Sequence, residues 1–143
     1  MGTQQNVEVM LEVFKAIEQR DLQRLLELFH PDVEFHWAPS LPYGGGASPG
    51  PEGERPTWAQ TWDPLQPTEA ERRMDPRVVA TSDDEVVVLW RQRGVTPAGV
   101  RFDGEVLGLY EVLDGKLARA QMFYFDTVPL ASFLAAKGTA TVP

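Results

Sequence analysis

The chain has 143 residues, with 21 Asp and Glu against 13 Lys and Arg, a net charge of −8 and no cysteine. This length suits one domain, residues 1–143, that buries a core without metal or disulfide staples. The acidic balance argues against a nucleic-acid partner, and the lack of thiols excludes disulfides and cysteine-ligated metals. Two histidines are too few for a histidine-rich metal site, so no metal is expected.

The sequence carries no recognisable targeting or membrane signal. Residues 1–6 have neither the positive segment nor the apolar segment of a secretory signal. No apolar run approaches the ~18 residues that a membrane span needs. A cytoplasmic location without a membrane partner is therefore the expectation.

Two helices and a strand are predicted at the N-terminus. Apolar residues recur at helical spacing over residues 7–17, and Asp21 is placed to cap a second helix over residues 22–29. Pro31 prevents that helix from continuing. Residues 33–37 then alternate between apolar and polar side chains, which predicts a strand with one buried face.

Residues 38–67 form a segment rich in proline and glycine, which we interpret as a flap with a helical turn near residues 56–62. A long helix or a central strand is excluded there, and a loop of this length in a small domain usually has a function. Aromatic residues lie in or beside the flap. We expect them to line a ligand pocket, with ordinary core packing as the alternative. They are Trp37, Tyr43, Trp58 and Trp62.

Beyond the flap the pattern is that of strands almost to the end. Short and long strands are predicted over residues 78–80 and 85–94, followed by a hairpin of residues 103–113 and 116–126 around Asp114-Gly115, a favoured type I′ turn. A final helix begins at Pro129. Helices followed by an antiparallel sheet predict an α+β fold, with helices covering one face of the sheet.

The hairpin turn also predicts which side chains share a face. If Leu113 pairs with Lys116 and no bulge intervenes, four further pairs lie on one face of the sheet. These pairs are Leu109–Ala120, Leu107–Met122, Glu105–Tyr124 and Asp103–Asp126.

This register would bring Asp103, Glu105 and Asp126 together beside Tyr124. Carboxylates held close together do not all ionise, which makes one of them a candidate general acid or base. In the alternative interpretation, Asp103 and Glu105 are solvated at a strand end and Asp126 simply caps the last helix. Arg91 or Arg93, of which alternation lets only one face Asp126, is a candidate to neutralise the cluster or hold a ligand carboxylate. The alternative is a surface salt bridge of little energetic value.

Taken together, these segments resemble the SnoaL-like polyketide cyclases. That family belongs to the superfamily that includes nuclear transport factor 2, ketosteroid isomerase and limonene epoxide hydrolase. The likeness covers nearly the whole chain and depends on the order and spacing of short motifs. They are VFKAI at 13–17, RDL at 20–22, LFHPDVEF at 28–35, LPYGG at 41–45, DGKL at 114–117 and YFD at 124–126.

The resemblance implies a curved, mostly antiparallel sheet wrapped around the N-terminal helices, as in a cystatin-like α+β barrel, with a cone-shaped apolar pocket. It also implies a homodimer and a catalytic acid at Asp126. The sequence departs from the relatives elsewhere. Val13 and Trp37 replace the isomerase tyrosine and aspartate, and Arg91-Gln92-Arg93 lacks the aspartate of the epoxide hydrolases. Steroid isomerisation by the isomerase machinery is therefore not expected.

The resulting hypothesis is a cofactor-independent enzyme that performs acid–base chemistry on a hydrophobic small molecule. Asp126 would act as acid or base, and Tyr124 or Tyr43 would donate a hydrogen bond. Two alternatives remain: a non-catalytic binder of a hydrophobic ligand, and an accessory module that dimerises through the outer face of its sheet. Besides the aromatic residues of the flap, the predicted ligand contacts are Phe14, Leu107, Leu109, Met122, Asp103, Glu105 and Arg91.

Overall fold

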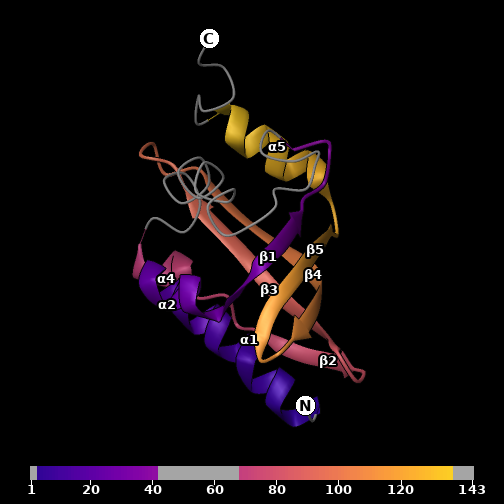
Figure 1. The fold of residues 1–143 in the computed structure, drawn as a ribbon. Helices are drawn as coiled ribbons and strands as arrows, with labels where there is room; N and C mark the ends of the chain where they lie inside the picture. The colour runs from indigo at the N-terminus through magenta and orange to yellow at the C-terminus, as the bar shows by residue number, and fades with distance from the viewer. Residues whose placement is uncertain (1–2, 42–67, 137–143) are drawn as a thin grey trace.

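A computed structural model describes residues 3–41 and 68–136 of the chain (Figure 1). Three predicted site residues of the flap, Tyr43, Trp58 and Trp62, and the predicted turn at 56–62 lie outside the described residues. The elements are α1 (Thr3–Glu18), α2 (Leu22–Leu28), β1 (Phe29–His36), α4 (Glu69–Arg72), β2 (Arg77–Thr81), β3 (Glu85–Val95), β4 (Arg101–Leu113), β5 (Lys116–Tyr124) and α5 (Thr127–Ala136).

The strands form one five-stranded sheet in the order β1-β5-β4-β3-β2. Only β1 and β5 pair in parallel, and the other neighbours are antiparallel. In Figure 1, α1 and α2 lie beside one part of the sheet and α5 lies near its opposite end. The predicted α+β class with a mostly antiparallel sheet and N-terminal helices is confirmed, and the sheet remains open.

The N-terminal elements follow from capping and from proline chemistry. Asp21 Oδ1 accepts a 3.0 Å hydrogen bond from the backbone N–H of Arg24, which caps α2 as expected. The helix then ends at Leu28, and β1 begins directly at Phe29. Pro31 is tolerated within β1 because this strand lies at the edge of the sheet, where one side needs no ladder donor.

The hairpin between β4 and β5 has the predicted turn but not the predicted register. Asp114 and Gly115 adopt φ values of 53° and 73°, as a type I′ turn requires, and Leu113 pairs with Lys116. A bulge follows, because Leu117 pairs with Val112 while Arg119 pairs with Glu111.

Beyond this bulge every pair is shifted by one residue, so the predicted faces are wrong. An extra residue in one strand exchanges inside and outside for the pairs that follow. Met122 and Tyr124 now share the inner face with Val106 and Tyr110. The β4 residues that the sequence placed on the same face as Met122 and Tyr124 lie on the outer face instead. They are Asp103, Glu105, Leu107 and Leu109.

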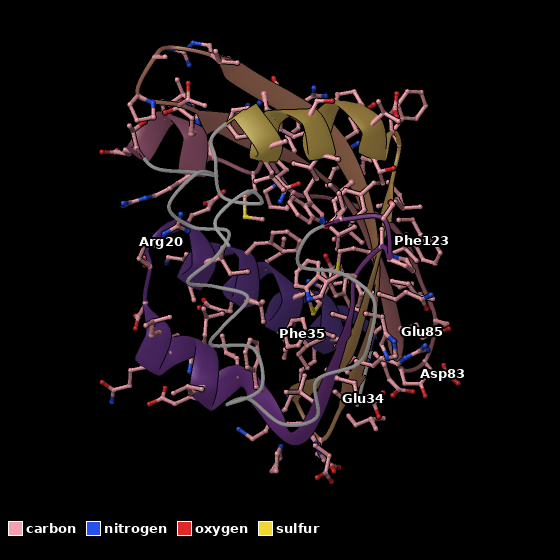
Figure 2. All side chains as sticks on the ribbon, turned by 90° about the horizontal axis from the view of Figure 1, so that it is seen from above. Arg20, Glu34, Phe35, Asp83, Glu85 and Phe123 are labelled. Carbon is pink, nitrogen blue, oxygen red and sulfur yellow. The ribbon has the colours of Figure 1, made fainter. Side chains whose placement is uncertain are left out.

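The buried side chains form two hydrophobic clusters. The larger joins the inner face of the sheet to α1 and α2, and Phe14 and Phe35 belong to it. The smaller is made of Leu41, Leu130, Phe133 and Leu134. Trp37 and Tyr124 are partly buried and pack against both clusters. Figure 2 shows Phe35 among the interior side chains and Phe123 at the outer side of the sheet.

Candidate functional site

The inner face of the sheet between the two hydrophobic clusters is rich in aromatic side chains. Trp90 on β3 pairs with Val106 on β4, which in turn pairs with Tyr124 on β5, so that these three residues form one row across the sheet. Trp37 directly follows β1 and stacks on Phe35, with ring centroids 6.0 Å apart. Trp90 and Val106 are buried in the larger cluster, whereas Trp37 and Tyr124 are only partly buried. Trp37 and Tyr124 therefore contribute accessible aromatic surface, as apolar ligand sites require.

A buried hydrogen bond lies at the centre of this face. Trp90 Nε1 donates to the hydroxyl of Tyr110 at 2.9 Å, and both side chains are buried. Phe14 of α1 contacts both rings edge-on, with ring centroids 5.9 Å from each. Burial raises the pKa of the Tyr110 phenol, so the hydroxyl stays protonated and can both accept and donate.

Gly108 makes this geometry possible. A Cβ at this position would overlap the hydroxyl and ring of Tyr110, so the tyrosine side chain occupies the space above the glycine. The phenol of Tyr110 therefore lies over position 108 and places a polar group on the inner face there.

Gln92 is a second polar side chain on the inner face, and the sequence hypothesis does not include it among the ligand contacts. It is 6% exposed, and its Oε1 has no hydrogen-bond partner among the residues that the structure describes. The signal was present in the alternation of β3, where Val86, Val88 and Trp90 alternate with exposed or half-exposed residues. The same period places Gln92 inside.

Asp126 and Tyr124 are close in sequence but differ in their surroundings. Tyr124 is half-buried between the two clusters. Asp126 is exposed, and its Oδ1 accepts a 3.0 Å hydrogen bond from the backbone N–H of Val128 in the first turn of α5. This is the capping geometry that the sequence left open as the alternative for Asp126.

The acidic residues of β4 are engaged on the outer face. Arg91 Nε lies 2.8 Å from Asp103 Oδ1, and Arg91 Nη1 lies 3.7 Å from Glu105 Oε2. Arg93 Nε adds a contact of 3.6 Å to Asp103 Oδ2. The side chains of the two acids are about half exposed, at 50% and 46%. These are surface salt bridges, which contribute little energy each.

The other predicted ligand contacts divide between the two faces. Phe14 and Met122 are buried on the inner side. Leu107 and Leu109 point to the outer side, where Leu107 is 38% exposed. Within residues 3–41 and 68–136, no group of three or more acidic or histidine side chains is arranged to hold a metal ion. No helix in those ranges is long and apolar enough to cross a membrane.

Comparison with known proteins assigns this fold to a family. Solved structures of a nuclear transport factor 2-like protein and of a protein with a cystatin-like fold share the fold of this chain. The chain belongs to the SnoaL-like domain family, whose model matches residues 10–120. The resemblance stated from the short motifs is therefore confirmed.

Solved structures show the same fold at low sequence identity. TerC, crystallised with polyporic acid, is 24% identical, with a TM-score of 0.77 over 92% of this chain and 98% of its own. A nuclear transport factor 2-like protein from Burkholderia xenovorans is 20% identical, with a TM-score of 0.76 over 94% and 98%. A protein assigned as a SnoaL-like polyketide cyclase from Jannaschia is 21% identical, with a TM-score of 0.70 over 99% and 94%. No curated protein sequence matches the chain.

Proposed function

We propose that this SnoaL-like domain binds a hydrophobic small molecule against the inner face of its sheet. The observation that carries the proposal is the division of the buried side chains into two clusters. Trp37 and Tyr124 pack against both clusters and keep part of their surface exposed. Apolar aromatic surface left accessible between two cores favours binding of an apolar ring. The complex of the similar TerC structure with polyporic acid supports a small organic ligand on this fold.

A ligand screen tests the proposal directly. A compound that binds only the native state raises the melting temperature by mass action, and one that lies against Trp37 changes its fluorescence. For a compound that binds, Trp37→Leu should weaken binding about tenfold or more, because the substitution removes a large aromatic contact. Phe123→Leu is the matched control, because Phe123 is 49% exposed on the outer face. Failure of every compound in a broad aromatic library would contradict the proposal.

Acid–base catalysis at Asp126 is the more specific form of this function. Asp126 follows Tyr124 closely at the end of β5, and Tyr124 contacts both clusters. To act on a ligand there, the carboxylate of Asp126 has to leave its hydrogen bond with Val128. The geometry therefore favours binding over catalysis, and a substitution at Asp126 described in the Discussion separates the two.

The outer face of the sheet favours a homodimer. Leu107 and Phe123 pair across β4 and β5 and are 38% and 49% exposed. Leu109 lies on the same face two residues from Leu107. Apolar side chains gathered on one sheet face favour association, and a second copy of the chain provides the same surface in a two-fold arrangement.

A further inference from the structure

The amide of Gln92 is buried in an apolar surrounding without full hydrogen bonding. The residue is 6% exposed, and Oε1 has no partner within the described part of the chain. Such atoms are uncommon in native proteins, because burial removes their bonds with water without replacing them. The stability of the fold therefore does not explain a glutamine at this position.

Glycine and aromatic residues surround Gln92 on the inner face. Its cross-strand partner is Gly104, and the next inward-facing residue of β3 is Gly94. The other neighbouring positions carry aromatic side chains. Phe102 lies over Gly104, where a Cβ would come 2.6 Å from Phe102 Cζ, and Trp90 already uses its N–H on another residue. Neither neighbour supplies a donor to the amide oxygen.

We propose that Gln92 Oε1 accepts a hydrogen bond from a hydroxyl group of the bound ligand, and that it thereby selects neutral phenols and alcohols. This inference rests on the proposed function, since it concerns the same inner face. An amide oxygen only accepts, so ethers, ketones and carboxylates leave it without a partner. An ionised ligand would also have to bury its charge against the rings of Trp90 and Phe102. A neutral ring compound with one hydroxyl meets both conditions.

Two pairs of probes isolate the hydroxyl: 2-naphthol with 2-methoxynaphthalene, and 4-phenylphenol with 4-methoxybiphenyl. Each pair has the same rings, and only the phenol can donate. Titration followed by tryptophan fluorescence and by calorimetry gives Kd for the wild type, Gln92→Met and Gln121→Met. Methionine resembles glutamine in length and lacks the amide. Gln121 is the matched control because it lies on the outer face, opposite Leu109.

The wild type and Gln121→Met should bind each phenol about tenfold more tightly than its ether, as expected for one buried hydrogen bond. In Gln92→Met this preference should disappear, while the ether binds at least as well as before. Equal binding of phenol and ether by the wild type, or a preference that survives in Gln92→Met, overturns the inference and leaves small-molecule binding intact. If none of the four probes binds the wild type, the inference is overturned, while the proposed function is decided separately by the broad aromatic library.

The melting temperature of the ligand-free protein gives an independent measure. If Oε1 lacks a partner in the free protein, Gln92→Met removes an unsatisfied atom and raises the melting temperature, by roughly 4 °C for a domain of this size. A lower melting temperature means that the amide already has a structural partner, and it contradicts the inference. Gln121→Met should leave the value unchanged within about 1 °C.

Discussion

The indole N–H of Trp90 donates a hydrogen bond to the hydroxyl of Tyr110, and the two side chains come from adjacent strands of the buried face. This bond fixes a hydroxyl in the middle of an otherwise apolar surface. It also orients the phenol, because the hydroxyl accepts from Trp90 and so directs its own proton elsewhere. The Tyr110 hydroxyl is therefore one defined polar point on the buried face, and the amide of Gln92 is another.

Gly108→Ala should destabilise the fold strongly, because the new methyl group would overlap the Tyr110 side chain. Moving the phenol breaks its bond with Trp90 and disturbs the contact with Phe14. We expect a loss of about 2–3 kcal/mol in the free energy of unfolding, measured by urea denaturation.

The control for Gly108→Ala is the same substitution in a Tyr110→Leu background. Leucine does not extend over position 108, so the alanine should then have an effect of less than about 1 kcal/mol. A similar loss in both backgrounds would show that the glycine matters for its backbone and not for the space it leaves.

Tyr110 should make the protein less stable in alkaline solution. Burial raises the pKa of its phenol above the ordinary value of 10.0, so the native state keeps a proton that the unfolded state releases. Stability from this group is complete below pH 10 and falls as the pH rises further, because the unfolded state then binds fewer protons. Urea denaturation between about pH 9 and about pH 11 should show a smaller loss in the free energy of unfolding for Tyr110→Phe than for the wild type.

Tyr110→Phe should itself lower stability at neutral pH, which provides an internal check. The substitution leaves Trp90 Nε1 buried without an acceptor, at a cost of about 1–3 kcal/mol. If stability at neutral pH is unchanged, water or another group has replaced the hydroxyl, and the hydrogen bond does not hold the two rings together.

The role of Asp126, as a helix cap or as a catalytic group, can be determined by comparing two substitutions. Asn also caps helices, so Asp126→Asn should leave stability almost unchanged, whereas Asp126→Ala should lower it by about 1 kcal/mol through loss of the bond from Val128 N–H. With a substrate in hand, a catalytic carboxylate requires that Asp126→Asn abolish turnover while the fold is intact. Full activity in Asp126→Asn would restrict the residue to its capping role.

Phe123→Glu should convert a dimer into a monomer. The charge would lie in the apolar part of the outer face, beside Leu107, and would be buried twice in a two-fold interface. Light scattering after size-exclusion chromatography measures the mass. Val79→Glu is the control, because Val79 is 43% exposed on the edge strand β2. A wild-type protein that is already monomeric at high concentration contradicts the proposed homodimer.

Local chemistry in the sequence predicted the elements well. The Asp21 cap, the Asp114-Gly115 turn and the alternation at residues 33–36 each depend on a few neighbouring residues, and each is present in the structure. The faces of the hairpin could not be predicted in the same way. The bulge near Val112 depends on how the two strands twist together, and no single residue of the sequence predicts it.

The consequence for the candidate site was large. One skipped residue, Ala118, moved Asp103 and Glu105 away from Tyr124 and placed Tyr110 inside. Gln92 was not predicted as a site residue for a different reason, since it stands between two arginines in the polar part of an otherwise apolar strand. Its burial depends on the period of the whole strand and not on its neighbours.

The parallel pairing of β1 with β5 joins the first described strand to the last one. Phe29 is registered with Leu117, so the first strand has no neighbour until the last one exists. During synthesis, α1 and α2 emerge long before the surface on which they pack is complete. We therefore expect the helices to form early and to remain undocked, and the final step of folding to be the entry of the C-terminal hairpin between β1 and β3.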